Sequence, residues 1–316
     1  MIKFSFSTLI RIATLMAACV LVGCGGASST VDPLVPTRVI AFGDAFSAVT
    51  PATGAGTFTV QTGDTDNTVA GRIAAKYGIY LNGTTTSGGY SYAVGTLLSG
   101  KVDNVATQIT SYLGHVGNSI GAKDLIIITV GSQDIYDIVV NNSGSISAAT
   151  TTLTSQIQRL TNAGAKYVLV VLPINMARTP WGLSGVNATS ETIRALSYDA
   201  GTQCLSFSCQ LSTKLNTAYP ATTSHQPILL VDLISYSNLF TGTTTTGSAN
   251  TYLNYGVTNP NSAACTAGGT SGCTTGAVNA NYATYVFADT LNLTPFANRL
   301  LADYIYNYNF YRAGWR

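Results

Sequence analysis

Short runs of apolar residues with almost no polar interruption are the feature that most constrains the fold of this chain. The clearest runs are residues 125–130, interrupted only by Thr129, and residues 167–172. A strand that is apolar on both faces is typical of a parallel sheet with helices on either side, because both of its faces are then buried. Strands of this kind are predicted at 38–42, 90–93, 125–130, 167–172 and 228–231.

The segments between these runs repeat their apolar residues at the helical spacing of three or four. Helices are predicted at 67–77, from Asp103 to about Leu113, at 153–164, at 189–215 and at 294–306, whereas 241–281 is predicted to be one long loop rich in Thr, Gly, Asn and Ser. Five strands alternating with helices predict an α/β fold, a three-layer α/β/α sandwich around a five-stranded parallel sheet.

The N-terminal segment has the pattern of a secretory signal. Lys3 and Arg11 precede a mostly apolar stretch at 12–22, and small residues follow at the point of cleavage. The sequence Leu-Val-Gly-Cys at 21–24 resembles a bacterial lipobox, which implies cleavage before Cys24 and attachment of a lipid to its thiol. The alternative is an ordinary signal peptide that happens to contain a cysteine.

This interpretation divides the chain into a signal peptide (1–23), a lipidated tether (24–37) and a single domain (38–316). Gly25, rather than an aspartate, follows Cys24, which favours an exported protein held in the outer membrane by its lipid. Both the periplasmic and the surface face of that membrane are compatible with the sequence. No later run is long and apolar enough to span a bilayer.

The mature chain is expected to have no excess charge. Removing residues 1–23 removes two of the 15 Lys and Arg residues and none of the 13 Asp and Glu residues. A neutral domain does not attract the phosphate backbone, so nucleic acid is not an expected partner, and we expect a monomer. Apolar residues make up 46% of the chain and charged residues 9%, which excludes the composition of a disordered chain.

Four cysteines beyond the signal and the tether form two close pairs, Cys204 with Cys209 and Cys265 with Cys273. Such pairs in an exported protein predict two short-loop disulfides. A zinc site is the alternative, but neither of the two histidines lies near a pair at ligand spacing. We therefore expect no metal and no cofactor.

The first predicted strand ends in Gly43 and Asp44, which are followed by Ala45 and Ser47. A strand that ends in Gly-Asp and small residues delivers a tight turn to the carboxyl edge of a sheet. Open α/β sheets bind their ligands at that edge. We therefore place the candidate site at this turn.

The turn resembles the first motif of the SGNH/GDSL hydrolases, a family of esterases and lipases in which the strand ends in Gly-Asp-Ser and the serine is the nucleophile. Ala45 stands at the nucleophile position. Residues 90–95 are similar to the second motif, with Gly95 as the oxyanion-hole glycine. Gly-Ser-Gln-Asp at 131–134 resembles the third motif, with Gln133 at the position of an oxyanion-hole asparagine.

Residues 287–295 resemble the last motif of the same family, in which Asp-x-x-His precedes a proline. Asp289 stands at the acid position and Asn292 at the position of the histidine base. The resemblance covers about residues 37–310 and implies the flavodoxin-like fold of that family.

The resemblance also implies a chemistry. A serine attacks an ester, a histidine moves its proton, an aspartate orients the histidine, and N–H groups hold the oxyanion. Ala45 has no oxygen with which to attack, and Asn292 does not accept a proton near neutral pH. These positions predict a non-catalytic relative, a pseudoenzyme, which binds an ester, an acyl chain or a glycan, or another envelope protein.

Two alternatives stay open. One is an active GDSL-type ester hydrolase with relocated catalytic residues, for which Ser47 is the nearest nucleophile. The other is a structural lipoprotein whose cleft is closed by the loop 241–281.

His225 is expected in a loop at the amino edge of the sheet, and His115 at a helix end whose dipole it neutralises. The segment 304–311 is expected to pack its aromatic rings, with a carbohydrate-stacking surface as the alternative.

Overall fold

The computed structural model describes residues 33–49, 58–62, 66–83, 88–198, 203–220, 226–242, 251–266 and 273–316. The expectations for the signal peptide, Cys24 and His225 therefore fall outside the described residues. The unit that contains the candidate site extends from Leu34 to Arg316.

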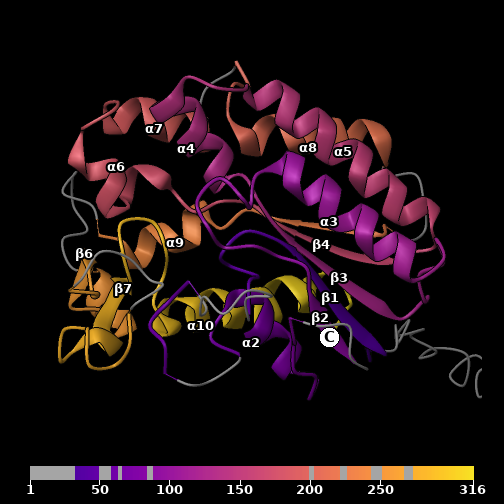
Figure 1. Cartoon of the computed structure of the whole chain (residues 1–316), viewed down its shortest axis with the longest axis horizontal. Coiled ribbons are helices and arrows are strands. Elements are labelled where there is room, and N and C mark those ends of the chain that lie inside the picture. The colour runs from indigo at the N-terminus through magenta and orange to yellow at the C-terminus, as the bar shows by residue number, and fades with distance from the viewer. Residues whose placement is uncertain are drawn as a thin grey trace, which may run out of the picture. The chain divides into compact units, whose positions relative to one another are not determined.

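Five parallel strands form the central sheet of this unit, as the apolar runs predict (Figure 1). They are β1 (Arg38–Gly43), β2 (Gly89–Ser91), β3 (Asp124–Thr129), β4 (Tyr167–Val171) and β5 (Ile228–Val231). Their order is β2-β1-β3-β4-β5, the flavodoxin-like order with its switch point beside β1. The β1–β3 register places Gly43 opposite Thr129, so both strands end at the same edge.

Helices cover both faces of the sheet, which confirms the three-layer sandwich. In Figure 1, α3, α5 and α8 lie on one side of the strands and α2 and α10 on the other. Their bounds are α2 Val69–Ala75, α3 Val102–His115, α5 Ile146–Asn162, α8 Phe207–Ala218 and α10 Pro295–Tyr304, which continues as a π-helix at Ile305–Phe310. The apolar spacing explains the burial, because Leu153, Ile157 and Leu160 of α5 are all fully buried.

The helix predicted at 189–215 is wrong as a single element. The structure has two helices there, α7 (Ser190–Ser197) and α8, which begins after Ser206. The Ser206 side chain accepts a hydrogen bond from Cys209 N–H at 3.2 Å, the geometry of an N-cap. Cys204 has a φ of 51°, a left-handed conformation that a continuous helix excludes. Thr189 does begin α7, as predicted.

The segment 241–281 contains regular structure that its composition conceals. A 3-10 turn occupies Thr251–Tyr255, and β6 (Asn259–Ala263) pairs in parallel with β7 (Tyr285–Phe287) to form a second, two-stranded sheet. The sequence of β6 is Asn-Pro-Asn-Ser-Ala, which lacks the β-branched and aromatic residues typical of strands. Its pairing therefore depends on β7 and not on its own propensity.

Several elements were not predicted, most of them because they are too short to carry a periodic signal. They are α4 (Ser132–Asn141), the 3-10 turn Met176–Arg178, α6 (Pro180–Ser184), α9 (Ile234–Phe240) and the 3-10 turn Tyr282–Thr284. Asp103 lies in the first turn of α3 and is not its N-cap, which is Lys101.

Both predicted disulfides form. The Cα atoms are 5.2 Å apart in Cys204–Cys209 and 5.6 Å apart in Cys265–Cys273. Cys273 is fully buried in a small apolar cluster with Val60 and Ala288, separate from the main core. Among the described residues, no helix has the length and apolar character needed to cross a membrane.

Candidate functional site

The Gly43 turn at the end of β1 is held by close contact with β3. Gly43 has a φ of 120°, and a Cβ atom at this position would lie 1.7 Å from the Thr129 carbonyl oxygen. The Gln108 side chain of α3 binds both backbone groups of Gly43. Its Oε1 accepts from Gly43 N–H at 2.7 Å, and its Nε2 donates to the Gly43 carbonyl at 3.1 Å. Only glycine fits this position.

Gln108 was not singled out from the sequence. The sequence did contain a signal for it, because Gln108 is a polar residue beside Ile109 on the apolar face of the predicted helix. In the structure Gln108 is buried. A buried amide requires hydrogen-bond partners, and here they are the backbone groups of the turn.

Asp44 secures the same turn from inside. Its Oδ1 accepts from Phe46 N–H at 3.1 Å and lies 2.8 Å from Thr129 Oγ1. The side chain is 3% exposed, and this burial raises the pKa of Asp44 to about 6. The contacts are those of a structural carboxyl group at a turn.

Ala45 and Ser47 follow in the turn and differ in what they present. Ala45 is 6% exposed and contributes only a methyl group at the position where the resemblance implies a nucleophile. Ser47 is fully buried, its Oγ lies 2.8 Å from Thr129 Oγ1, and its carbonyl accepts from Ser91 Oγ at 2.7 Å. The Ser47 hydroxyl therefore faces β3 and not the solvent.

Gln133, in the first turn of α4, is engaged by the loop that follows β2. Its Oε1 accepts from Gly100 N–H at 2.7 Å, and its Nε2 lies 3.5 Å from the Gly95 carbonyl oxygen. Gly100 is itself pressed onto the turn, because a Cβ there would lie 2.5 Å from Asp44 Cα. The Gln133 amide thus holds the loop 95–100 against the Gly43 turn.

Asp289 and Asn292 form a closed turn after β7. Asp289 Oδ1 accepts from Leu291 N–H at 2.8 Å and from Asn292 N–H at 2.6 Å. Asp289 Oδ2 accepts from Asn292 Nδ2 at 2.8 Å. Both side chains are half-buried. The Asp289 carboxylate therefore orients the Asn292 amide, at the position where the resemblance implies a histidine.

Direct contacts bring the first three motifs together at the carboxyl ends of β1 and β3. Val94 N–H donates to the Gly43 carbonyl at 3.0 Å, which places Gly95 beside the turn. The last motif is joined to them through the segment 58–59. The Phe58 ring lies against Gly95, and Thr59 Oγ1 donates to the Leu293 carbonyl at 2.7 Å.

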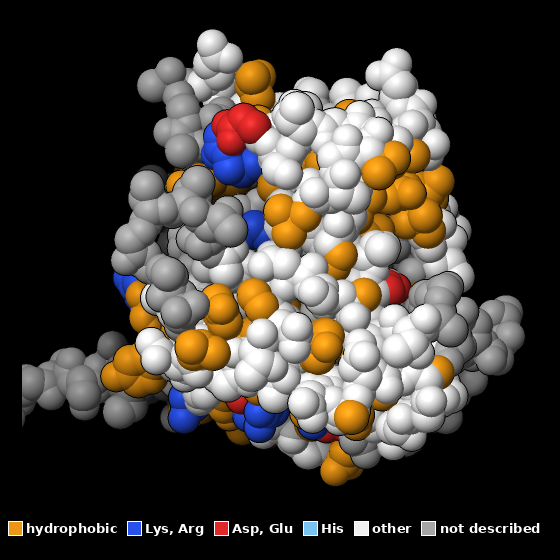
Figure 2. All heavy atoms as spheres, turned by 90° about the vertical axis from the view of Figure 1, so that its left-hand side faces the viewer, with side chains coloured by type: hydrophobic (Ala, Val, Ile, Leu, Met, Phe, Trp, Pro, Cys, Tyr) orange, Lys and Arg blue, Asp and Glu red, His pale blue; other side chains and the backbone are white. Residues whose placement is uncertain are grey.

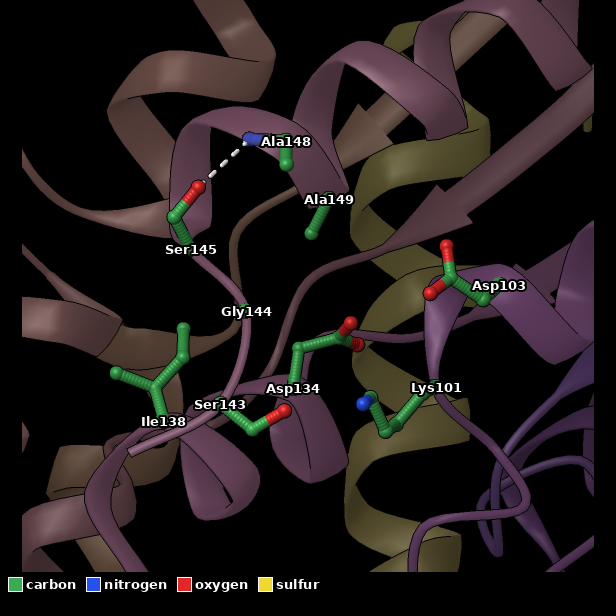
Figure 3. A pocket seen from close by; sticks show the side chains of 9 residues that line it. All are labelled: Lys101, Asp103, Asp134, Ile138, Ser143, Gly144, Ser145, Ala148 and Ala149. Atoms are coloured by element: carbon green, nitrogen blue, oxygen red, sulfur yellow. Dashed lines mark hydrogen bonds between the residues drawn. The ribbon is translucent and has the colours of Figure 1, made fainter. Parts of the chain in front are cut away.

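A cavity of about 50 Å³ is lined by residues of α4 and of the segments where α3 and α5 begin (Figure 3). Figure 3 shows Asp134, Lys101 and Asp103 around this space, with Ser145 capping α5 through Ala148 N–H. The Asp134 carboxyl receives only long contacts of 3.3 Å from Val102 N–H to each oxygen. Burial raises the pKa of Asp134 to about 7.

Lys101 forms an ion pair with Asp137 of α4, and its charge also acts on Asp134, whose pKa it lowers by less than burial raises it. Within the described residues, no group of three or more His, Cys, Asp or Glu side chains is placed to hold a metal ion.

His115 and the C-terminal tyrosines make contacts within the protein. His115 Nδ1 lies 2.7 Å from the Tyr92 hydroxyl. Tyr304 stacks between Tyr236 and Tyr308, with ring centroids 4.0 and 5.2 Å away, and Arg312 lies 5.4 Å from the centroid of Tyr308. Because the ring faces are used by neighbours, these contacts favour aromatic packing over a carbohydrate-stacking surface.

The surface beside β6, β7 and α6 has few charged side chains, as Figure 2 shows for the described residues of this face. Hydrophobic side chains are scattered among uncharged polar ones on it.

A five-stranded parallel sheet covered on both faces, with a Gly-Asp turn at its carboxyl edge, defines a doubly wound α/β protein. A family model described as GDSL-like lipase/acylhydrolase matches residues 39–305, and the chain therefore belongs to this family.

One similar solved structure is a member of the lipolytic protein G-D-S-L family from Veillonella parvula DSM 2008. It is 12% identical, with a TM-score of 0.44, over 86% of this chain and 97% of that chain. The comparison with curated proteins found no match.

Proposed function

We propose that this member of the GDSL-like family does not hydrolyse esters and uses the same region to bind a ligand or another envelope protein. Ala45 supplies no nucleophile, and Asn292 supplies no base. In serine hydrolases the loss of either group removes most of the rate enhancement, so the loss of both leaves no route to an acyl-enzyme.

The observation that carries this proposal is the set of hydrogen bonds made by the two amide side chains at the positions that correspond to the family's catalytic residues. Gln133 binds Gly100 N–H, and Asn292 binds the Asp289 carboxylate. Both amides thus take part in hydrogen bonds that hold the loop 95–100 and the turn after β7. The burial of Ser47 against Thr129 argues against a relocated nucleophile.

The ligand in this proposal is an uncharged ester, acyl chain or glycan, in keeping with the low charge of the chain. We further propose that a lipid on Cys24 anchors the exported protein to the outer membrane, that the protein is a monomer, and that nucleic acid is not its partner. Radiolabelled palmitate incorporated into wild-type protein, but not into Cys24→Ser, would test the anchor.

Hydrolysis of p-nitrophenyl acetate and butyrate tests the loss of catalysis. Full-length wild-type protein in detergent is compared with the triple variant Ala45→Ser, Gln133→Asn, Asn292→His. The single variant Ala45→Ser is the matched control, because it restores the nucleophile without the base. We expect wild-type protein to match the buffer blank and the triple variant to exceed it by at least about 10²-fold.

Sustained turnover by wild-type protein would overturn the proposal, provided that a bulky Ala45→Trp substitution abolishes it and so locates it at this turn. An organophosphonate adduct on a serine of wild-type protein, mapped by mass spectrometry, would identify the relocated nucleophile in that case. Inactivity of both the wild type and the triple variant would mean that the surrounding geometry no longer supports the reaction.

A further inference from the structure

The short segment 58–61 contacts two motifs in space, the second at 90–95 and the last at 287–295, and hydrogen bonds fix it to the last one. Thr59 Oγ1 donates to the Leu293 carbonyl at 2.7 Å, and Gln61 N–H donates to the Cys273 carbonyl at 2.8 Å. Val60 is fully buried in the apolar cluster around Cys273. Two hydrogen bonds and one buried side chain therefore set the position of this segment.

Phe58 projects from this segment onto Gly95. A Cβ atom built on Gly95 would lie 1.8 Å from Cδ2 of the ring and 2.5 Å from Cγ and Cε2. The ring thus fills the space that any side chain at position 95 would need, which explains physically why this position is a glycine. Gly95 is buried, whereas the Phe58 ring is only half-buried, so the ring lies on the outer side of the glycine.

Gly95 borders the turn that holds Ala45. Val94 N–H binds the Gly43 carbonyl at 3.0 Å, and Gln133 holds the loop 95–100 against Asp44. A group that covers Gly95 therefore stands beside the approach to Ala45, which is only 6% exposed.

We infer that Phe58 determines the size of the ligand group that reaches Ala45. The inference deepens the proposed function and rests on it for the identity of the site. An aromatic ring carries no charge, and the backbone that follows Phe58 is held by the hydrogen bonds of Thr59 and Gln61. It would admit a small uncharged group beside Gly95 and exclude a bulky one. The hydrogen bonds of Thr59 and Gln61 position the ring for this role.

Thiol labelling measures access to position 45 without any assumption about the ligand. The full chain carries Ala45→Cys together with Cys19→Ser and Cys24→Ser, so that the new thiol is the only cysteine outside the two disulfides. Rates of alkylation by iodoacetamide, N-ethylmaleimide and N-pyrenylmaleimide are measured by mass spectrometry with Phe58, Phe58→Leu, Phe58→Ala and Phe58→Trp. Tyr80→Ala is the matched control, because Tyr80 is an aromatic ring 62% exposed near the opposite end of β2.

We expect the rate to fall in the order Ala, Leu, Phe, Trp at position 58. The gain from Phe58→Ala should be at least about fivefold for the pyrenyl reagent and smaller for iodoacetamide. The Tyr80→Ala variant should keep the parent rates. Phe58→Leu retains an apolar contact and keeps the test valid if Phe58→Ala does not fold.

Rates that do not depend on the residue at position 58, in variants whose circular dichroism matches the parent, would overturn the inference. So would an equal gain for all three reagents, because a general loosening of the turn admits small and large groups alike. Ester hydrolysis by wild-type protein would overturn the proposed function without altering the labelling order. The two ideas therefore fail on different results.

Discussion

Gln133 Oε1 accepts a hydrogen bond from Gly100 N–H at 2.7 Å, across 33 positions of sequence. This contact joins the first turn of α4 to the loop after β2 and presses Gly100 onto Asp44. The side chain is 6% exposed, so water does not replace the bond when it is broken. Gln133 is therefore part of the structure that holds the Gly43 turn in place.

Replacement of Gln133 tests this role. Gln133→Ala leaves the buried Gly100 N–H without its acceptor, which should lower the free energy of unfolding by about 1–3 kcal/mol in urea titrations. Gln133→Asn is one methylene shorter and should lose a similar amount. Gln158→Ala, at an exposed position of α5, is the control and should change stability by less than about 0.5 kcal/mol. Equal stability of all three variants would show that the bond is dispensable.

Gly43 offers a test of the turn itself. Gly43→Ala places a Cβ 1.7 Å from the Thr129 carbonyl at a φ of 120°, so we expect a loss above about 4 kcal/mol or a failure to fold. Gly78→Ala is the matched control, because Gly78 has a φ of 69° and no atom lies within 4 Å of the point that a Cβ would occupy. It should cost only about 1–2 kcal/mol. Similar losses of stability in both variants would mean that the backbone of β3 shifts enough to accommodate a Cβ atom at position 43.

The buried carboxyls predict a dependence of stability on pH. Burial raises the pKa of Asp44 to about 6 and that of Asp134 to about 7, from an ordinary value of 3.8. In the folded protein they keep their protons at pH values at which the unfolded chain has lost them. Their stabilisation is therefore complete below about pH 4 and is lost as the pH rises through 6 and 7.

Urea unfolding between pH 4 and pH 8 measures this effect. We expect these two groups together to lower the free energy of unfolding by on the order of 6 kcal/mol across that range. Asp134→Asn is neutral throughout and should flatten the part of the curve near pH 7. An unchanged slope in Asp134→Asn would show that Asp134 is ionised in the folded protein at pH 4 as well.

The two disulfides should differ in their contribution to stability. They close loops of similar length, which on entropic grounds is worth about 2–3 kcal/mol each. Cys273 is fully buried beside Val60 and Ala288, so Cys265→Ser with Cys273→Ser also places hydroxyl groups in an apolar cluster. The thermal midpoint should therefore fall further in that double variant than in Cys204→Ser with Cys209→Ser. The reverse order would contradict this.

β2 is only Gly-Tyr-Ser, and it overlaps the strand predicted at 90–93. The other four strands could be predicted because each contains an apolar run long enough to be recognised within itself. The same is true of α5, whose apolar residues recur at helical spacing, and of the two close cysteine pairs. The Gly-Asp turn after β1 and the start of α4 after β3 could be placed at the carboxyl edge because strand direction in a parallel sheet decides which ends meet.

The sequence by itself therefore determined the layers, the sheet and the edge at which the Gly43 turn lies. Only the tertiary structure decided what each side chain binds. Gln133 binds Gly100, Gln108 binds Gly43, the Phe58 ring packs against Gly95, and β6 pairs with β7. The physical reason is that periodicity records which face of an element is buried. The partner of a buried amide or ring depends on how distant segments pack, which no local spacing encodes.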